Sequence, residues 1–448
     1  AGLKVGLTIR PTEVVYREGQ TPRFWQRDVK DPVALMSEKV TYARKRWGVT
    51  VFYLDSNVFG PGFDTQLPPD SNVPWMMPSA MIEQLHAKHP DCLVIPEWSE
   101  TDNHRFTAPY SGVNIRSLGT NPDARRLYPD GFSVVSVSVD LIQNNWDALL
   151  NAVQGGDVLM LPAWYPAPEN APGLLLYREA AIRKQGMPQV LNGTPSPEVL
   201  IANSTSTDEA TRYYAALLMG KCSDTGTAAA LIAMLHDVEP LVRKSALVGL
   251  SQRDAIADQK LIDELGTWLE KPGDASNAGL RTFVAKVLGH IGKPAVPRLM
   301  TVLQNGSPET ASYVYYALGQ TGTDDPQSVT ALLKPLQAAV GSNLNQETTI
   351  RALGNLKAKA AVPTLLKVLN DKERDHEVIR QQAVIALGRI GDKSAIGPLV
   401  AEFGKNYTSF VVYSIPQSLD DALGSLTGQK GLVGADDWRR WWAQQRKQ

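Results

Sequence analysis

Cysteine, net charge and long apolar runs are all scarce in this chain of 448 residues. Cys92 and Cys222 are its two cysteines, and neither has a Cys or His neighbour at metal-ligand spacing, which excludes zinc fingers, iron–sulfur sites and disulfide frameworks. The 45 basic and 46 acidic side chains give a formal net charge of −1, which argues against nucleic acid or an anionic membrane as partner. No run approaches the roughly 20 apolar residues of a membrane span. The composition predicts a soluble protein of two or three domains.

Several catalytic signatures are missing as well. The sequence has no G-x-S-x-G elbow, no G-x-x-x-x-G-K-[ST] loop and no strand-linked G-x-G-x-x-G, so the usual serine hydrolases and nucleotide binders are excluded. We therefore expect no metal and no organic cofactor. The N-terminus shows no signal peptide, and its first residue is Ala rather than Met, as in a processed chain or a fragment. The compartment stays open, with a secreted or periplasmic location favoured over a cytoplasmic one.

The C-terminal half repeats a pattern of two helices. A glycine follows an apolar helix six times, with intervals of 29, 40, 30, 35 and 34 residues between successive glycines. The best copies, at 288–303, 353–369 and 387–403, contain Leu-Gly, then Ala-Val or Ala-Ile, and then a Leu-rich helix. Neither helix of such a pair can bury its apolar face alone, so neighbouring repeats must stack. The six glycines are Gly220, Gly249, Gly289, Gly319, Gly354 and Gly388.

This pattern resembles HEAT repeats over roughly residues 207–428. The resemblance implies an all-α solenoid that binds a protein partner. The final segment, 436–448, carries Trp438, Trp441 and Trp442 at helical spacing and predicts a helix that caps the last repeat. An aromatic stripe that binds a ligand is the alternative for these tryptophans.

The N-terminal half alternates short β-branched runs with helical segments. Strands are predicted at 3–9, 49–54, 92–95, 133–139 and 158–161, and helices at 32–46, 79–88, 143–153 and 174–183. Apolar strands separated by helices predict a parallel sheet that is covered on both faces. We therefore expect an α/β domain at 1–186, a linker rich in Pro, Ser, Asn and Thr at 187–206, and the solenoid at 207–448.

Polar residues gather where the predicted strands end, which is where parallel sheets bind ligands. Asp55 follows the second strand and Glu97 the third, so both are predicted to lie over the same edge. Two carboxyl groups across a cleft are the machinery of glycoside hydrolysis, and either residue could be the acid. The alternative is structural, because acids at strand ends also cap helices or pair with arginine.

Further polar and aromatic residues lie near the same predicted edge and would contact a sugar. Arg10 could hold a substrate hydroxyl or form an ordinary ion pair, and the aromatic side chains could stack on sugar rings or pack in the core. The predicted substrate-binding residues are Arg10, Trp25, Asn57, Trp98, His104, Tyr110, Trp164 and Tyr165.

The segments RWGVTVFYLDSN (46–57), HPDCLVIPEWSE (89–100) and TAPY (107–110) resemble part of a (β/α)8-barrel of the glycoside hydrolase type. The resemblance implies that Asp55 and Glu97 are catalytic. Five predicted strands fall short of the barrel's eight, so the sheet would be a partial TIM-barrel that stays open or closes against another chain or the solenoid. The leading hypothesis is a carbohydrate-binding protein that hydrolyses a glycosidic bond. The alternative is a non-enzymatic scaffold or assembly subunit with an inactive α/β domain.

Overall fold

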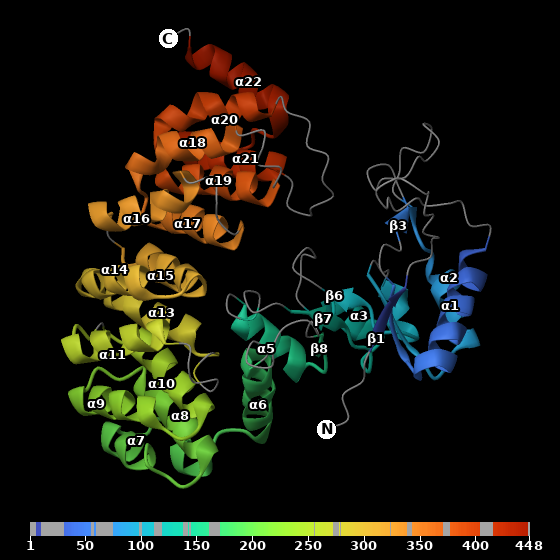
Figure 1. The fold of residues 1–448 in the computed structure, drawn as a ribbon, viewed down its shortest axis with the longest axis horizontal. Coiled ribbons are helices and arrows are strands. Elements are labelled where there is room, and N and C mark those ends of the chain that lie inside the picture. The colour runs from blue at the N-terminus through green and yellow to red at the C-terminus, as the bar shows by residue number, and fades with distance from the viewer. Residues whose placement is uncertain are drawn as a thin grey trace. The chain divides into compact units, whose positions relative to one another are not determined.

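The computed structural model divides into two compact units, Ala1–Pro166 and Ala167–Gln448 (Figure 1). The helical solenoid lies in the second unit, and the strands lie in the first. The structure describes residues 6–9, 31–54, 58–59, 75–97, 101–111, 119–137, 142, 145–160, 171–254, 256–271, 277, 279–322, 324–337, 343–370, 377–403 and 415–446.

Six of the described strands of the first unit form two parallel sheets of three strands each, and each sheet follows chain order. The short strand β6 and a two-stranded antiparallel hairpin were not predicted, whereas the five predicted strands are confirmed. The first sheet contains β1 (Gly6–Ile9), β2 (Val51–Leu54) and β5 (Leu93–Pro96), the second contains β6 (Tyr110–Ser111), β7 (Val134–Ser136) and β8 (Val158–Met160), and the hairpin pairs β3 (Val58–Phe59) with β4 (Trp75–Met76).

The expected partial barrel is not supported by these strands. Between the two sheets the chain forms a 3-10 turn, η1 (Thr101–Arg105), and β6 has only two residues. One backbone hydrogen bond, from Ala108 N–H to the oxygen of Val94 (3.4 Å), connects the segment just before β6 to β5. A single bond is too little to continue a strand ladder, so the described strands remain two small sheets.

Helices cover one face of the first sheet. Alternation along β2 turns Phe52 and Leu54 toward α1 (Pro32–Trp47) and α2 (Ser79–Lys88), and all of them share one apolar core. Helix α1 begins at Asp31, whose side chain accepts the N–H of Ala34 (2.9 Å), and ends at Gly48 in the left-handed region. The second sheet is accompanied by α3 (Pro122–Leu127) and α5 (Trp146–Gln154).

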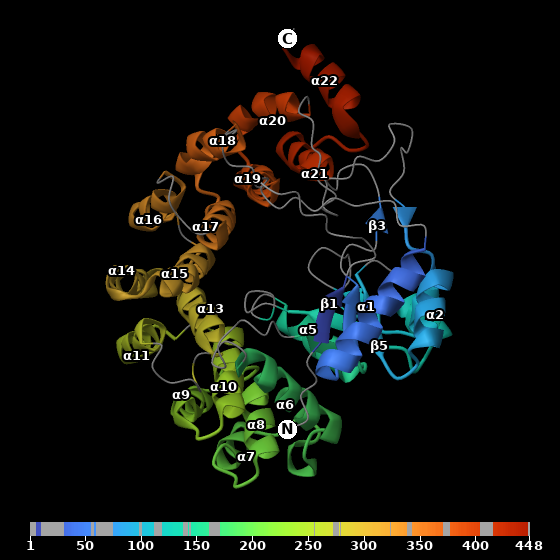
Figure 2. The same cartoon turned by 45° about the vertical axis from the view of Figure 1, so that its right-hand side comes forward.

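The second unit is a helical solenoid of two rows (Figure 2). Each helix of the inner row packs on the inner-row helices before and after it in the chain, and the helices of the outer row pack behind them. The inner row is α8 (Glu209–Met219), α10 (Pro240–Gln252), α13 (Arg281–Ile291), α15 (Pro308–Gln320), α17 (Asn343–Asn355), α19 (Glu377–Ile390) and α21 (Ile415–Thr427). The outer row is α7 (Pro197–Asn203), α9 (Thr225–Ala233), α11 (Gln259–Glu270), α14 (Val296–Asn305), α16 (Pro326–Gln337), α18 (Val362–Asn370) and α20 (Ile396–Glu402).

The repeated glycines mark close helix–helix contacts in the inner row. A Cβ atom on Gly319 would lie 2.6 Å from both Cα and Cβ of Ala352 in the next helix, and one on Gly388 would lie 2.8 Å from Cα of Ala422. These distances are far below van der Waals contact. The glycines therefore recur in the sequence where the backbones of neighbouring inner helices are too close to admit a side chain.

Changing Gly319→Ala is expected to destabilise the second unit by about 1–3 kcal/mol, because the new methyl group must push the α15 and α17 backbones apart. The matched control is Gly424→Ala in α21, where the nearest atom to a new Cβ would be the Gln429 oxygen at 3.5 Å. There, alanine's higher helix propensity should stabilise by about 0.5–1 kcal/mol. Urea denaturation of both variants checks the sign. Equal effects at the two sites would contradict the close-contact account.

The division between units at Pro166 and Ala167 differs from the boundary expected at 187–206. Helix α6 (Ala171–Gln185), predicted as the last helix of the α/β domain, groups with the solenoid, and the expected linker contains η3 (Gln189–Leu191) and α7. At the other end, α22 (Gly434–Gln445) packs on α20 and α21. Trp438 in α22 is buried and donates its indole N–H to Asp420 (2.9 Å), which is the arrangement of a capping helix.

Candidate functional site

Most residues of the predicted sugar site lie outside the part of the chain that the structure describes. Three of them are described: Glu97 follows β5 of the first sheet, Tyr110 begins β6 of the second sheet, and His104 lies in η1 between them in the chain. Those outside the described residues are Arg10, Trp25, Asp55, Asn57, Trp98, Trp164 and Tyr165.

Glu97 directly follows β5, where its backbone N–H donates to the oxygen of Leu54 (3.1 Å). Its half-buried side chain comes at a bend, directly after Pro96 ends the strand. Tyr53 of β2 and Tyr110 of β6 belong to different sheets, and their ring centroids lie 5.3 Å apart in a cluster that includes Leu93 and Ile95 of β5. Two aromatic rings therefore lie beside the strand that Glu97 follows.

His104 lies beside the amino end of β7, whereas Glu97 follows the carboxyl end of β5. Its Nε2 atom is 3.2 Å from the hydroxyl of Ser133, which directly precedes β7, and its Nδ1 atom is 3.2 Å from the oxygen of Thr101. The structure therefore places His104, predicted to contact substrate, beside the amino end of β7. Its ring is held by hydrogen bonds that serve the loop structure.

A buried carboxylate organises these loops. Asp157 accepts hydrogen bonds from the backbone N–H groups of Thr120 and Ser133, both 2.9 Å long, and from the Thr120 hydroxyl. Arg125 forms an ion pair with it at 3.0 Å. Because both carboxylate oxygens are engaged, Asp157 holds the chain before β7 and β8 in place, and a structural role accounts for all of its contacts.

Burial lowers the pKa of His104 below its usual value, so unfolding of the first unit should depend on pH. Well above about pH 6.5 both the folded and the unfolded ring are uncharged. Below that value the unfolded chain binds a proton that the folded ring resists, so the unfolding free energy should fall as the pH decreases. Burial also lowers the pKa of His89, which acts in the same direction.

Denaturation of wild type and His104→Gln across this pH range isolates the contribution of His104. The variant should lose less stability on acidification than wild type does. Identical profiles would contradict the inferred pKa shift.

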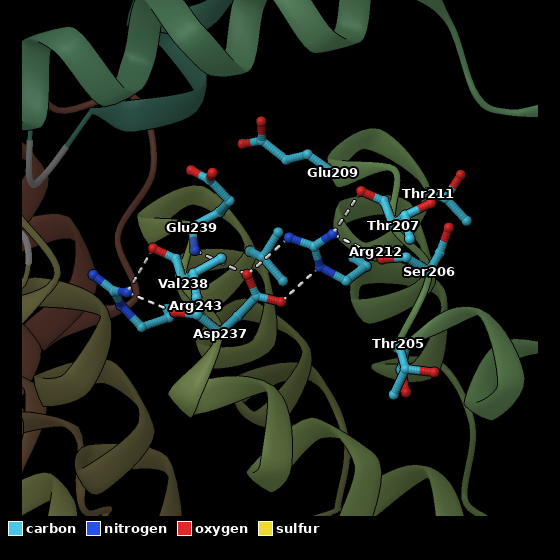
Figure 3. Close-up of polar contacts among 12 residues, drawn as sticks. Thr205, Ser206, Thr207, Glu209, Thr211, Arg212, Asp237, Val238, Glu239 and Arg243 are labelled. Carbon is cyan, nitrogen blue, oxygen red and sulfur yellow. Dashed lines mark hydrogen bonds and ion pairs between the residues drawn. The ribbon is translucent and has the colours of Figure 1, made fainter.

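The start of the solenoid holds a second polar site, which sequence reasoning missed (Figure 3). Arg212 of α8 binds both carboxylate oxygens of Asp237, at 2.7 and 3.0 Å, and donates to the carbonyl oxygens of Ser206 and Thr207. The hydrogen bonds to Asp237 raise the pKa of Arg212, which stays charged. This arginine therefore ties the loop before α8 to the loop before α10.

The next repeat contains the same arrangement of an arginine bound to carbonyl oxygens of the preceding loop. Arg243 of α10 donates to the carbonyl oxygens six and five residues before it, at Asp237 and Val238, as Arg212 does in its own repeat (Figure 3). The two arginines are 31 residues apart, which is one repeat. That spacing was the sequence signal that could have identified them.

Helix α6 docks on the inner row through a buried carboxylate. Glu179 is fully buried and accepts hydrogen bonds from Lys244 of α10, from the Tyr213 hydroxyl of α8 (2.7 Å) and from Arg183 (2.8 Å). Burial alone would raise the pKa of Glu179, but the Lys244 ammonium and these hydrogen bonds outweigh it and hold the pKa below its usual value. Glu179 is therefore ionised, and burial raises the pKa of Tyr213, which keeps the proton that it donates.

An exposed ion-pair pattern flanks this buried contact. Arg178 bridges Glu209 of α8 and Glu239, the residue that precedes α10, at 2.7 Å in each case. Its side chain is 43% exposed, so these pairs should orient α6 more than they stabilise it. The inner row thus binds α6 through the buried carboxylate of Glu179 and the exposed ion pairs of Arg178.

The inner row continues beyond α6 with cations next to aromatic rings. Lys244 lies 5.0 Å and Lys286 5.3 Å from the ring centroid of Phe283, and Arg281 lies 5.7 Å from that of Tyr313. Such pairs offer both a positive charge and an apolar surface. Lys244, Arg281 and Phe283 are buried and Lys244 already binds Glu179, so within this set it is the half-buried Lys286 and Tyr313 that could contact a carboxylate or an apolar side chain.

No group of His, Cys, Asp and Glu in the described ranges could hold a metal ion. Likewise, none of the helices in the part of the chain that is described is long and apolar enough to cross a membrane.

Residues 335–419 match the family of HEAT repeats. A search of curated proteins found no match. Among solved structures, the complex of CpcE and CpcF of phycocyanin lyase from Nostoc sp. PCC7120 is 24% identical, with 58% of this chain and 98% of that chain covered and a TM-score of 0.33. Human deoxyhypusine hydroxylase in complex with glycerol is 20% identical, with 65% and 98% covered and a TM-score of 0.26.

Proposed function

We propose that this chain is a protein-binding scaffold whose inner solenoid row receives a helical segment of a partner. One observation carries the proposal, the docking of α6 on α8 and α10 through Glu179. This contact is an example, within the chain, of what the inner row binds. The HEAT match at 335–419 supports a solenoid that continues the same row.

Affinity purification of the full chain with quantitative identification of bound proteins tests this proposal. Lys286→Glu in α13 and Tyr313→Ala in α15 alter the inner row, whereas Lys367→Glu alters an exposed lysine of the outer helix α18. A partner should be retained by wild type and by Lys367→Glu and lost from the two inner-row variants. Loss from all three variants, or from none, would contradict binding by the inner row.

A second candidate function is carbohydrate binding beside the Tyr53–Tyr110 ring pair of the first unit. Its support is the contact of these two rings beside β5, the strand that Glu97 directly follows. The proposed catalytic pair remains Asp55 and Glu97. Glycan binding and hydrolysis by wild type, Asp55→Asn and Glu97→Gln test it, and activity that survives both changes would refute the pair.

A further inference from the structure

Two large aromatic side chains stand exposed at the end of α1, far along the chain from the solenoid. Tyr42 is 62% and Trp47 is 59% exposed, and their rings meet edge to face with centroids 5.6 Å apart. Exposing apolar surface to water is unfavourable, and two adjacent exposed rings form a contiguous apolar patch of the kind found at binding surfaces. Trp and Tyr are also the residues most enriched among the energetic centres of protein interfaces.

A hollow of about 410 Å³ is formed by the same helix end and the start of β2. Its lining contains two cations, two hydroxyl groups and no acid. This volume falls within the range of binding pockets, which is about 300–1,000 Å³. The lining residues are Thr41, Arg44, Lys45, Gly48, Val49 and Thr50.

The last turn of α1 is strongly basic. Arg44, Lys45 and Arg46 follow one another, and only Arg44 has an ion-pair partner among the described residues, Asp91. Glu38, the acid on the same helix, lies two turns before Lys45, about 10 Å along the axis. Cations at a helix C-terminus complement the helix dipole, which explains their charge but not the exposed rings beside them.

We propose that this surface, formed by Tyr42, Trp47 and the basic hollow, docks an acidic segment of a partner protein that also carries a large apolar side chain. The carboxylates would meet Lys45 and Arg46, and the apolar side chain would pack on the two rings. A nucleic acid fits less well, because two unpaired cations on a chain of net charge −1 are far fewer than about 6–10 phosphate contacts. The surface lies in the first unit, so this inference does not depend on the function proposed for the solenoid.

Selection of random peptides displayed on phage tests the proposal with the full chain as target. Counter-selection against the Tyr42→Ala/Trp47→Ala variant removes every peptide that binds elsewhere. The retained peptides should be rich in Asp and Glu with one large apolar residue. Lys45→Glu should weaken each of them by about tenfold.

The matched control lies on α3, where Arg126 and Leu127 form another exposed pair of a cation and an apolar residue. Arg126→Glu/Leu127→Ala should leave peptide binding unchanged, and unaltered thermal unfolding should show that every variant is folded. Retained peptides without acids, no retained peptides, or equal loss in the control would overturn the proposal. So would heparin or single-stranded DNA binding that depends on Trp47, or a dimer in sedimentation velocity that Trp47→Ala dissociates.

Discussion

Replacing Glu179 by alanine should destabilise the second unit by about 3–5 kcal/mol. The change leaves the Lys244 ammonium, only 3% exposed, without its carboxylate and removes the acceptor of the Tyr213 hydroxyl. A buried charge without a partner costs several kcal/mol because no water replaces the lost carboxylate. Urea denaturation measures the loss, and limited proteolysis should show new cleavage between α6 and α7.

Two matched variants separate the buried charge from helix contacts in general. Arg178→Ala, one residue earlier in α6, removes only exposed ion pairs and should cost about 0–1 kcal/mol. The double change Glu179→Leu/Lys244→Met replaces the buried pair with apolar side chains and should restore most of the lost stability. A Glu179→Ala variant as stable as Arg178→Ala would contradict the buried contact.

Arg212→Ala should also destabilise the solenoid by about 3–5 kcal/mol, by a different route. It leaves Asp237, whose side chain is 9% exposed, without its bidentate partner and frees the carbonyl oxygens of Ser206 and Thr207. The loops before α8 and α10 then lose the bonds that join them. Thermal unfolding followed by circular dichroism measures the effect.

Arg212→Lys keeps the charge but not the planar, two-pronged geometry, so it should recover only part of the stability. The control is Arg351→Ala in α17, where a half-exposed arginine pairs with Glu347 one turn away and should contribute about 0.3–0.5 kcal/mol. Full rescue by lysine, or equal losses at Arg212 and Arg351, would show that the bidentate geometry is unimportant.

The solenoid could be predicted from the sequence because its period records a physical contact. Gly319 and Gly388 recur where inner helices touch through their backbones, so period and packing carry the same information. The strands of the first unit were also predictable, because short runs of apolar β-branched and aromatic residues, such as that of β2, are local signals. Closure of strands into a barrel is not a local signal, and the described strands do not support the barrel that the resemblance to glycoside hydrolases implied.

The contacts of α6 could not be predicted either. In the sequence, Glu179 lies among charged and apolar residues and resembles an ordinary exposed acid. Its partners Tyr213 and Lys244 lie 34 and 65 residues further along the chain. The same holds for His104, which follows two acids in the sequence but bonds to Ser133. Side chains whose partners come from distant repeats or strands carry no periodic signal, and only the fold reveals them.

Native-state hydrogen exchange on the full chain tests most directly whether the inner row holds a docked helix. The backbone amides of α6 from Leu175 to Ile182 should exchange as slowly as those of α8 from Tyr213 to Met219, because both helices open only when the buried contact breaks. In Glu179→Ala, the α6 amides should exchange faster while those of α15 and α17 stay protected. Fast exchange of α6 in the wild-type chain, or protection unchanged by the substitution, would contradict this account.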